Sequence, residues 1–478
     1  MMTFSKQCLH LLASAKIQNL LDLVIQSNHK STSMFSSFTR LGVRLMFLFV
    51  ALPFLSYAQQ TRLLTLDEAI ILARGHNYQL KVDSLQLVLA QNRIAQVRSA
   101  ALPQFVLNST YQRLTNNITP FVISLPEGSF AINPQILNQS YNAVQLTQLL
   151  FAGGKAKYGI KAIKKEAEAQ QWDFGKSVLE QEYTTIDLWF NLYNARASKK
   201  LILANIETLK GKRNDLDEFR KQGLVLANDV LKIDLSVTIL GSTLADINSL
   251  VESLNYNLCT ITGIDPATVI EIPDTFLHPV TEIDGLNNYM EKALNQRPEI
   301  KAFELRNEAA QLRIKVTKAD FFPTLNLIGS YNYDMPNQRI IPNANSFNYS
   351  AYAGLNLNWR ISNLYTNQAR LRESKLGASQ LESSFRQVKE GMQMEVNANY
   401  QEYKKTLAKN QLVRTELEQA QENFRVEQNK LDAQTTTPAD FLDSNLRLLQ
   451  AQMNLATATA NAELAYRKLI KSTGVTTN

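Results

Sequence analysis

The chain has 478 residues with only 13 prolines and 17 glycines, a composition that argues against a disordered chain and excludes a collagen-like one. Its length suits two or three ordinary domains or one elongated domain. The nominal net charge is +7, from 50 Lys and Arg against 43 Asp and Glu. Such an excess suggests nucleic acid or an anionic surface as a partner only if it belongs to the folded part.

The amino-terminal segment is predicted to be a leader. An eleven-residue apolar run, 45–55, follows two arginines and precedes Ser-Tyr-Ala, a small-large-small pattern that suits a signal peptidase. We expect a signal peptide from about Met34 to Ala58, with residues 1–33 as an upstream extension of the reading frame. The run is shorter than the roughly 20 apolar residues of a membrane-spanning helix.

Residues 1–58 also carry most of the charge. They contain five basic side chains and one acidic one, so the 420 residues after Ala58 have a net charge of only +3. A nucleic-acid partner is therefore not expected. Cys259 alone remains after cleavage, so no disulfide can form within the processed chain.

The sequence after the leader repeats itself. A shift of 220 residues aligns 73–111 with 293–331 without a gap, with ten of 39 positions identical. A shift of 211 then aligns Gly263 with Gly474. We predict two structural repeats.

The boundaries of the repeats are placed at 59–272 and 273–478. The nine extra residues of the first repeat are assigned to the loop 114–139, which is rich in Asn, Pro and Ser. Each repeat reads as a helix, a strand, a loop, a strand and two very long helices joined by a turn.

Proline is absent from 135–265 and from 343–437, so helices can run there without interruption. Residues 155–211 alone would make a helix of roughly 85 Å. The following helix carries a heptad seam of apolar residues: Val230, Ile233, Val237, Leu240, Leu244, Ile247, Val251, Leu254, Leu258 and Ile261. These patterns predict long helical hairpins of coiled-coil type.

Four segments alternate between apolar and polar residues, as strands do. They span about 104–114, 141–150, 324–334 and 348–360. Their length and the tyrosines near their ends suit transmembrane barrel strands. A half-buried sheet of a soluble protein gives the same alternation, so both interpretations stay open at this point.

The number of strands bears on the choice between a membrane barrel and the sheet of a soluble protein. An open sheet edge in lipid leaves backbone groups unpaired at several kcal/mol each. Four strands cannot close a barrel, because single-chain barrels begin at about eight. If the chain enters a membrane, it must share a barrel with copies of itself, and three copies would supply twelve strands.

The motifs resemble those of the TolC-like outer-membrane efflux and secretion channels. Residues 66–72 (LDEAIIL) are similar to the opening helix of that family, and Pro103 and Pro323 to its helix-to-strand junctions. The segment 145–151 (QLTQLLF), with Gly153 and Gly154 shortly after it, is similar to its second strand and exit turn.

The resemblance implies a mainly α-helical homotrimer with a long periplasmic α-barrel and a twelve-stranded β-barrel in the outer membrane. It also implies two kinds of partner, a periplasmic adaptor protein and an inner-membrane transporter.

Two turns between long helices are expected at the periplasmic tip. The first turn is similar to the family's Gly-Leu-Val motif that contacts the adaptor. Gly223 permits the positive φ of a tight helix end, and Leu224 and Val225 would be exposed apolar anchors. The alternative is that both aliphatic side chains pack the turn. At the second turn Thr435 and Thr436 are assigned to the same docking surface.

The second turn resembles the segment where the family places two aspartates at the channel entrance. Asp440 and Asp443 are three residues apart and share a helix face. In a trimer they would form a ring of six carboxylates that attracts cations and raises its own pKa values. The same residues also make an ordinary helix start, with Thr437 as N-cap and Pro438 in the first helical position. Both interpretations can hold together.

The sequence departs from the family at the entrance. Gln434 and Thr436 stand where well-known members have a Gly and an Arg that holds the entrance closed. Asp229 matches the carboxylate partner of that Arg, so it is assigned to the entrance without a salt bridge. A closed state would depend on packing or on hydrogen bonds from the residues 434–436.

No catalytic site is predicted. The processed chain has two histidines, His76 and His278, and neither metal-ligand spacing nor a nucleotide-binding glycine motif. We expect no cofactor, no metal and no enzymatic activity.

The favoured function is a passive duct in the outer membrane that expels small toxic compounds handed over by a pump and an adaptor. One alternative is the same duct in an ATP-driven protein or peptide secretion system. Another, of a different class, is a soluble periplasmic coiled-coil scaffold.

Overall fold

A computed structural model describes residues 61–117, 119–132, 135–273, 283–337, 339–341 and 343–475. The predicted signal peptide, the upstream extension and His278 lie outside the described residues. From Arg62 onward the chain forms one compact unit.

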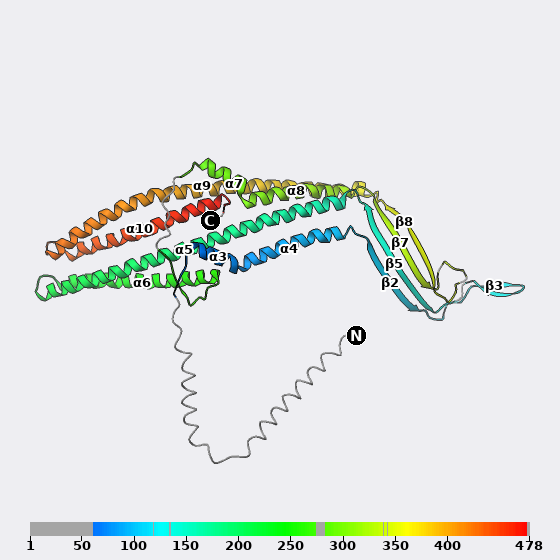
Figure 1. Ribbon diagram of the computed structural model, residues 1–478, viewed down its shortest axis with the longest axis horizontal. Coiled ribbons are helices and arrows are strands. Elements are labelled where there is room, and N and C mark those ends of the chain that lie inside the picture. The colour runs from blue at the N-terminus through cyan, green and yellow to red at the C-terminus, as the bar shows by residue number, and fades with distance from the viewer. Residues whose placement is uncertain are drawn as a thin grey trace, which may run out of the picture. The chain divides into compact units, whose positions relative to one another are not determined.

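Two very long helices organise this unit (Figure 1). α5 spans Lys155–Lys221 and α9 spans Asn363–Asp432, which corresponds to roughly 100 Å each. Each continues through a tight turn into a shorter antiparallel helix, α6 (Ala227–Thr262) and α10 (Pro438–Ser472). α5 therefore includes the segment 155–211 and extends ten residues beyond it, because nothing in 212–221 breaks the helix before Gly223.

Shorter helices extend the hairpins toward the sheet (Figure 1). α4 (Tyr78–Ser99) and α8 (Pro298–Ala319) both pack on α5, and α8 also packs on α9. Nearer the turns that join α5 to α6 and α9 to α10, it is α10 that packs on α5. Within the described part of the chain, no helix is both long and apolar enough to cross a membrane.

The helices are held together by apolar seams. Ile233 and Leu258 of the predicted α6 seam are fully buried, and the other seam residues belong to the same core clusters or pack on them. Trp189 of α5 is fully buried as well, and its indole N–H donates to the carbonyl of Leu64 at 3.1 Å.

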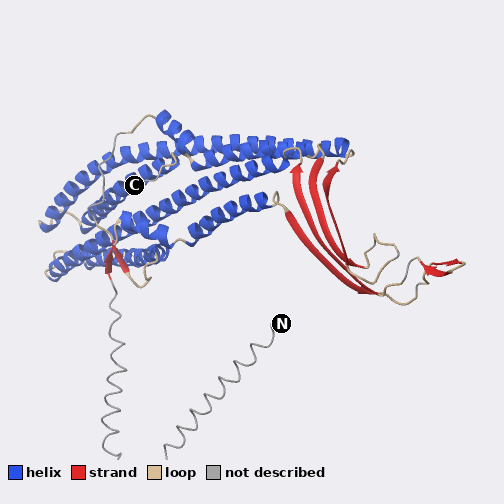
Figure 2. Cartoon of the chain, turned by 45° about the vertical axis from the view of Figure 1, so that its right-hand side comes forward, coloured by secondary structure: helices blue, strands red, loops and turns tan. Residues whose placement is uncertain are grey.

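A four-stranded antiparallel sheet continues from the helices (Figure 2). Its order is β2 (Gln104–Arg113), β5 (Asn138–Phe151), β7 (Thr324–Met335) and β8 (Asn348–Asn358). The fourth strand ends two residues before the predicted 360, where the chain turns into α9. β5 begins three residues before the predicted 141.

The segment 114–139 is not only a loop. It contains a small hairpin of β3 (Val122–Leu125) and β4 (Gly128–Ala131), which pair antiparallel. Four-residue strands carry too few residues for a period of two to stand out in the sequence.

Small elements cover the middle of the long helices. α3 (Leu66–His76) packs on α5, and α7 (Leu286–Gln296) packs on α9. β1 (Thr61–Leu63) pairs with β6 (Val269–Glu271).

The two hairpins end in the same way, on a glycine with positive φ. Gly263 follows α6 with φ +73° and lies against His76, and Gly474 follows α10 with φ +85° and lies against Arg297. A Cβ at Gly474 would come within 2.7 Å of the Arg297 backbone, so a larger residue does not fit there.

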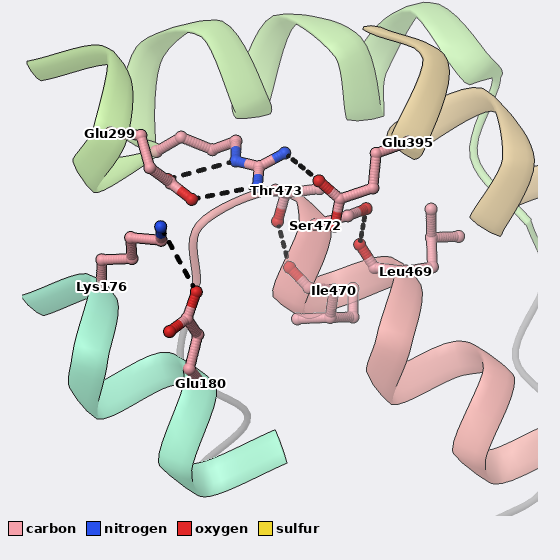
Figure 3. A network of polar contacts seen from close by, with 9 residues as sticks. Lys176, Glu180, Glu299, Glu395, Leu469, Ile470, Ser472 and Thr473 are labelled. Atoms are coloured by element: carbon pink, nitrogen blue, oxygen red, sulfur yellow. Dashed lines mark hydrogen bonds and ion pairs between the residues drawn. The ribbon is translucent and has the colours of Figure 1, made fainter. Parts of the chain in front are cut away.

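Arg297, which lies against Gly474, also forms ion pairs with residues of α8 and α9. Its guanidinium donates to Glu395 of α9 at 2.7 Å and to Glu299 of α8 at 3.2 Å, and its side chain is 11% exposed. Figure 3 shows Glu299 and Glu395 beside Ser472 and Thr473 at the end of α10. The end of α10 is thus fixed where α7, α8 and α9 meet it.

We predict that Gly474→Ala lowers the free energy of unfolding by about 1–3 kcal/mol, because it combines an unfavourable φ with a backbone clash. The matched control is Gly211→Ala, since Gly211 lies in the interior of α5 with open space around its Cα. The control should be neutral or stabilising by up to about 1 kcal/mol. Denaturant unfolding followed by helical circular dichroism measures both, and equal stability of the two variants would contradict the account of the junction.

Candidate functional site

The first tip is the turn between α5 and α6, and its backbone is a Schellman motif. Gly223 has φ +75°, its N–H donates to the carbonyl of Arg220 at 3.0 Å, and the N–H of Leu224 donates to that of Phe219 at 2.9 Å. Glycine adopts this left-handed conformation without steric cost. The turn is therefore tight and fixed by backbone bonds.

The apolar residues of this tip do not all face solvent. Leu224 is 52% exposed and Leu226 is 72% exposed, whereas Val225 packs against the core cluster that contains Leu216 and Val230. The prediction of two exposed anchors is wrong for Val225, because the turn directs alternate side chains inward and outward. Leu226 is an exposed apolar residue that the sequence analysis missed.

Asp229 has a local role at this tip. Its carboxylate accepts a hydrogen bond from the backbone N–H of Leu226 at 3.3 Å and pairs with Lys232 at 3.0 Å. It therefore stabilises the first turn of α6, where negative charge is favoured by the helix dipole.

The second tip, between α9 and α10, has the same backbone geometry with a different residue. Gln434 has φ +57°, and the N–H of Thr435 donates to the carbonyl of Lys430 at 2.8 Å. A non-glycine residue in this region is uncommon and costs free energy. Hydrogen bonds from the hydroxyl groups of Thr435 and Thr436, to Lys430 and Glu427, hold the turn.

Thr437 caps α10 as expected. Its side chain accepts from the backbone N–H of Asp440 at 3.2 Å and donates to the Asp440 carboxylate at 2.6 Å. These bonds favour the charged form, and the hydrogen bond from Thr437 lowers the pKa of Asp440 within the single chain. The raised pKa that the sequence analysis expects concerns a ring of several chains and stays a prediction.

Asp440 and Asp443 line one polar hollow of about 540 Å³ together with Thr435, Thr436 and Glu427. Asp443 also pairs with Arg447 one turn further along α10, at 2.7 Å. Sequence analysis missed Glu427 and Arg447, although the i, i+4 spacing of Asp443 and Arg447 is a recognisable signal. Asp229 is on the other tip and does not line this hollow.

The sheet at the other end of the helices has two chemically distinct faces. The strand register places Leu107, Val144, Tyr331 and Ala351 in one row, and Leu146, Gly329 and Ala353 with Phe105 in the next. Facing residues lie on the same side of a sheet, so this face is apolar across all four strands.

The opposite face is polar. Its rows include Asn108 with Ala143 and Asn332 with Ser350, and also Ser330 with Tyr352.

Large apolar side chains on the first face are open to solvent in the single chain, with Phe105 70% and Leu355 65% exposed. β2 and β8 each have one edge without a partner strand in the described part of the chain.

The difference in burial between Val225 and Leu224 at the first tip can be tested by substitution. We predict that Val225→Ala lowers the free energy of unfolding by about 1 kcal/mol, because it removes apolar contacts from the core cluster. Leu224→Ala, the matched control, should change it by no more than about 0.5 kcal/mol, since Leu224 faces solvent. Thermal unfolding of both variants checks this, and an equal loss in both would show that Leu224 is also part of the core.

Part of the chain matches a known protein family. Residues 289–475 match the family described as outer membrane efflux protein. None of the curated proteins compared with the chain matches its sequence.

Solved structures of outer-membrane channels share the fold over 86% of this chain. The channel OprN is 20% identical, with a TM-score of 0.71 and 89% of its own chain covered. VceC from Vibrio cholerae is 16% identical, with a TM-score of 0.72 and 96% covered. CmeC from Campylobacter jejuni is 16% identical, with a TM-score of 0.71 and 85% covered. The family match therefore concerns residues 289–475, and the fold shared with these outer-membrane proteins extends over 86% of the chain.

Proposed function

We propose that three copies of this chain form a passive duct in the outer membrane, through which an inner-membrane pump and a periplasmic adaptor expel small toxic compounds. The observation that carries the proposal is the two-faced sheet with two unpaired edges at one end of very long helices. A soluble scaffold is not expected to expose an apolar sheet face to this extent, because such patches cause aggregation.

The sheet supports a shared barrel. In lipid, the unpaired backbone groups of β2 and β8 would cost several kcal/mol each. Pairing β2 of one copy with β8 of the next removes every edge, and three copies give twelve strands. The apolar face would then contact lipid, and the polar face would line the lumen.

The long helices also expose apolar side chains that other copies of the chain could cover. On α6, the residues Leu231, Leu235 and Ile239 are spaced by four and are between 57% and 61% exposed. On α9, Met394 and Leu412 are 68% and 70% exposed. Apolar stripes of this size are typical of surfaces that a second chain covers, so we assign them to the contacts between copies in a helical tube that extends into the periplasm.

We further propose that the chain arose as two repeats of one strand-and-helix unit, 59–272 and 273–478. The two tips share their backbone geometry, with Gly223 and Gln434 at equivalent positions. The glycines after α6 and α10 are also equivalent and lie against equivalent junctions between short helices.

The tips support the two roles that the family resemblance implies. At the first tip, the exposed Leu224 and Leu226 form an apolar surface for the adaptor, next to Gly223. A photo-crosslinker at Leu226 that captured no adaptor in an assembled pump would contradict this docking role.

At the second tip, Asp440, Asp443 and Glu427 would give the entrance nine carboxylates in a trimer. Arg447, which pairs with Asp443, and Lys430, which pairs with Glu427 at 2.7 Å, would balance them in part. Without the family's arginine, the closed entrance would depend on packing and on the hydrogen bonds of the threonines. No catalytic step is proposed, and the energy for transport would come from the pump.

The entrance role is tested by single-channel recording in planar bilayers. We predict that Asp440→Asn with Asp443→Asn lowers cation selectivity and weakens block by multivalent cations by about tenfold, because the removed charges attract cations. The matched control is Asp67→Asn with Glu291→Gln, which removes two carboxylates from the short helices α3 and α7.

The control should keep the parent selectivity. Unchanged selectivity in the tip variant would show that these aspartates do not line the entrance. A purified protein that forms no channels at all would contradict the duct itself.

A further inference from the structure

A second hollow lies between α5, α9 and α10, away from both tips. Its lining includes Tyr183 and Asp187, which are some 35 residues before the first tip, or about 50 Å along α5. The volume is about 520 Å³, enough for a small organic molecule. Three lysines line it: Lys405, Lys409 and Lys468.

Two of these lysines have no acidic partner. Lys405 pairs with Glu402 at 2.6 Å. Among the described residues, Lys409 and Lys468 have no carboxylate within ion-pair distance. The other acid of the hollow is Asp187, which accepts a hydrogen bond from Asn191 at 3.1 Å. Two ammonium groups are therefore available to a ligand.

The floor of the hollow adds an unpaired donor. Asn399 is 6% exposed, and its amide nitrogen has no acceptor in the described part of the chain. Leaving a buried N–H unpaired costs free energy, which an acceptor atom entering the hollow would recover. Burial and Asp187 raise the pKa of Tyr183 to about 12, so its phenol stays neutral and adds no negative charge.

One wall of the hollow, at Lys405, lies on the side of α9 away from α7, whereas Ala465 on the other wall belongs to the core cluster that α7 covers. Val396 of α9 belongs to the core cluster that α7 covers, and Lys405 follows it by nine residues. Nine residues correspond to two and a half helical turns, so the two side chains lie on opposite faces. In a conducting tube α7 must lie outside, because inside it would obstruct the lumen. The Lys405 side of the hollow then faces the lumen.

We propose that this hollow is a binding site for small anionic solutes, carboxylates or phosphates, held by Lys409, Lys468 and the amide of Asn399. Its position inside the duct rests on the proposed function, whereas the binding itself does not.

Calorimetric titration of the full-length protein in detergent with inorganic pyrophosphate, and separately with succinate, tests the site. We expect one saturable site per chain for at least one of the two probes. Lys409→Gln with Lys468→Gln should weaken binding by at least about tenfold, because two charge-assisted hydrogen bonds are lost. The matched control, Lys200→Gln with Lys210→Gln, removes two exposed lysines of α5 that do not line the hollow and should bind like the parent.

If neither probe shows saturable binding, the proposal is overturned. It is also overturned if both double variants weaken binding equally, because that result indicates diffuse charge attraction. Single-channel recording separates the site from the duct. If the protein conducts and binds pyrophosphate but the anion leaves the current unchanged, the placement in the lumen is wrong while the site stands. If the protein binds pyrophosphate but forms no channel, the duct proposal fails alone.

Discussion

The unpaired edges of the four-stranded sheet are the constraint on which the rest of the account depends. Every backbone N–H and C=O of a strand needs a partner, and in lipid no water can supply one. β5 and β7 have neighbours on both sides, whereas β2 and β8 have one each. With an apolar face spanning all four strands, the sheet is stable in a membrane only when other copies complete it.

The tips show how one backbone geometry can serve two chemistries. Both close with the same pair of backbone hydrogen bonds, at Gly223 and at Gln434. The first tip presents leucines, which suit a partner protein, and the second presents carboxylates and hydroxyl groups, which suit contact with water and ions. Gln434 accepts the less favourable conformation because threonine hydroxyl groups brace the turn on Lys430 and Glu427.

Much of the fold could be predicted from the sequence, since long proline-free segments, heptad seams and strand alternation extend over many residues. The β3–β4 hairpin could not be, because each strand is four residues long. At the tips, the residue types were recognisable but their orientation was not: Val225 turns inward and Leu226 outward, which only the turn geometry decides. The bond from Thr436 to Glu427 joins residues nine apart across a turn, a contact without a periodic signal.

The mass of the complex extracted from the outer membrane in mild detergent, determined by native mass spectrometry, tests the central claim most directly. The account predicts three copies of the processed chain, whose twelve strands would form a closed ring with no strand edge unpaired. A stable single chain in the membrane extract, with its apolar sheet face covered by detergent alone, would contradict it.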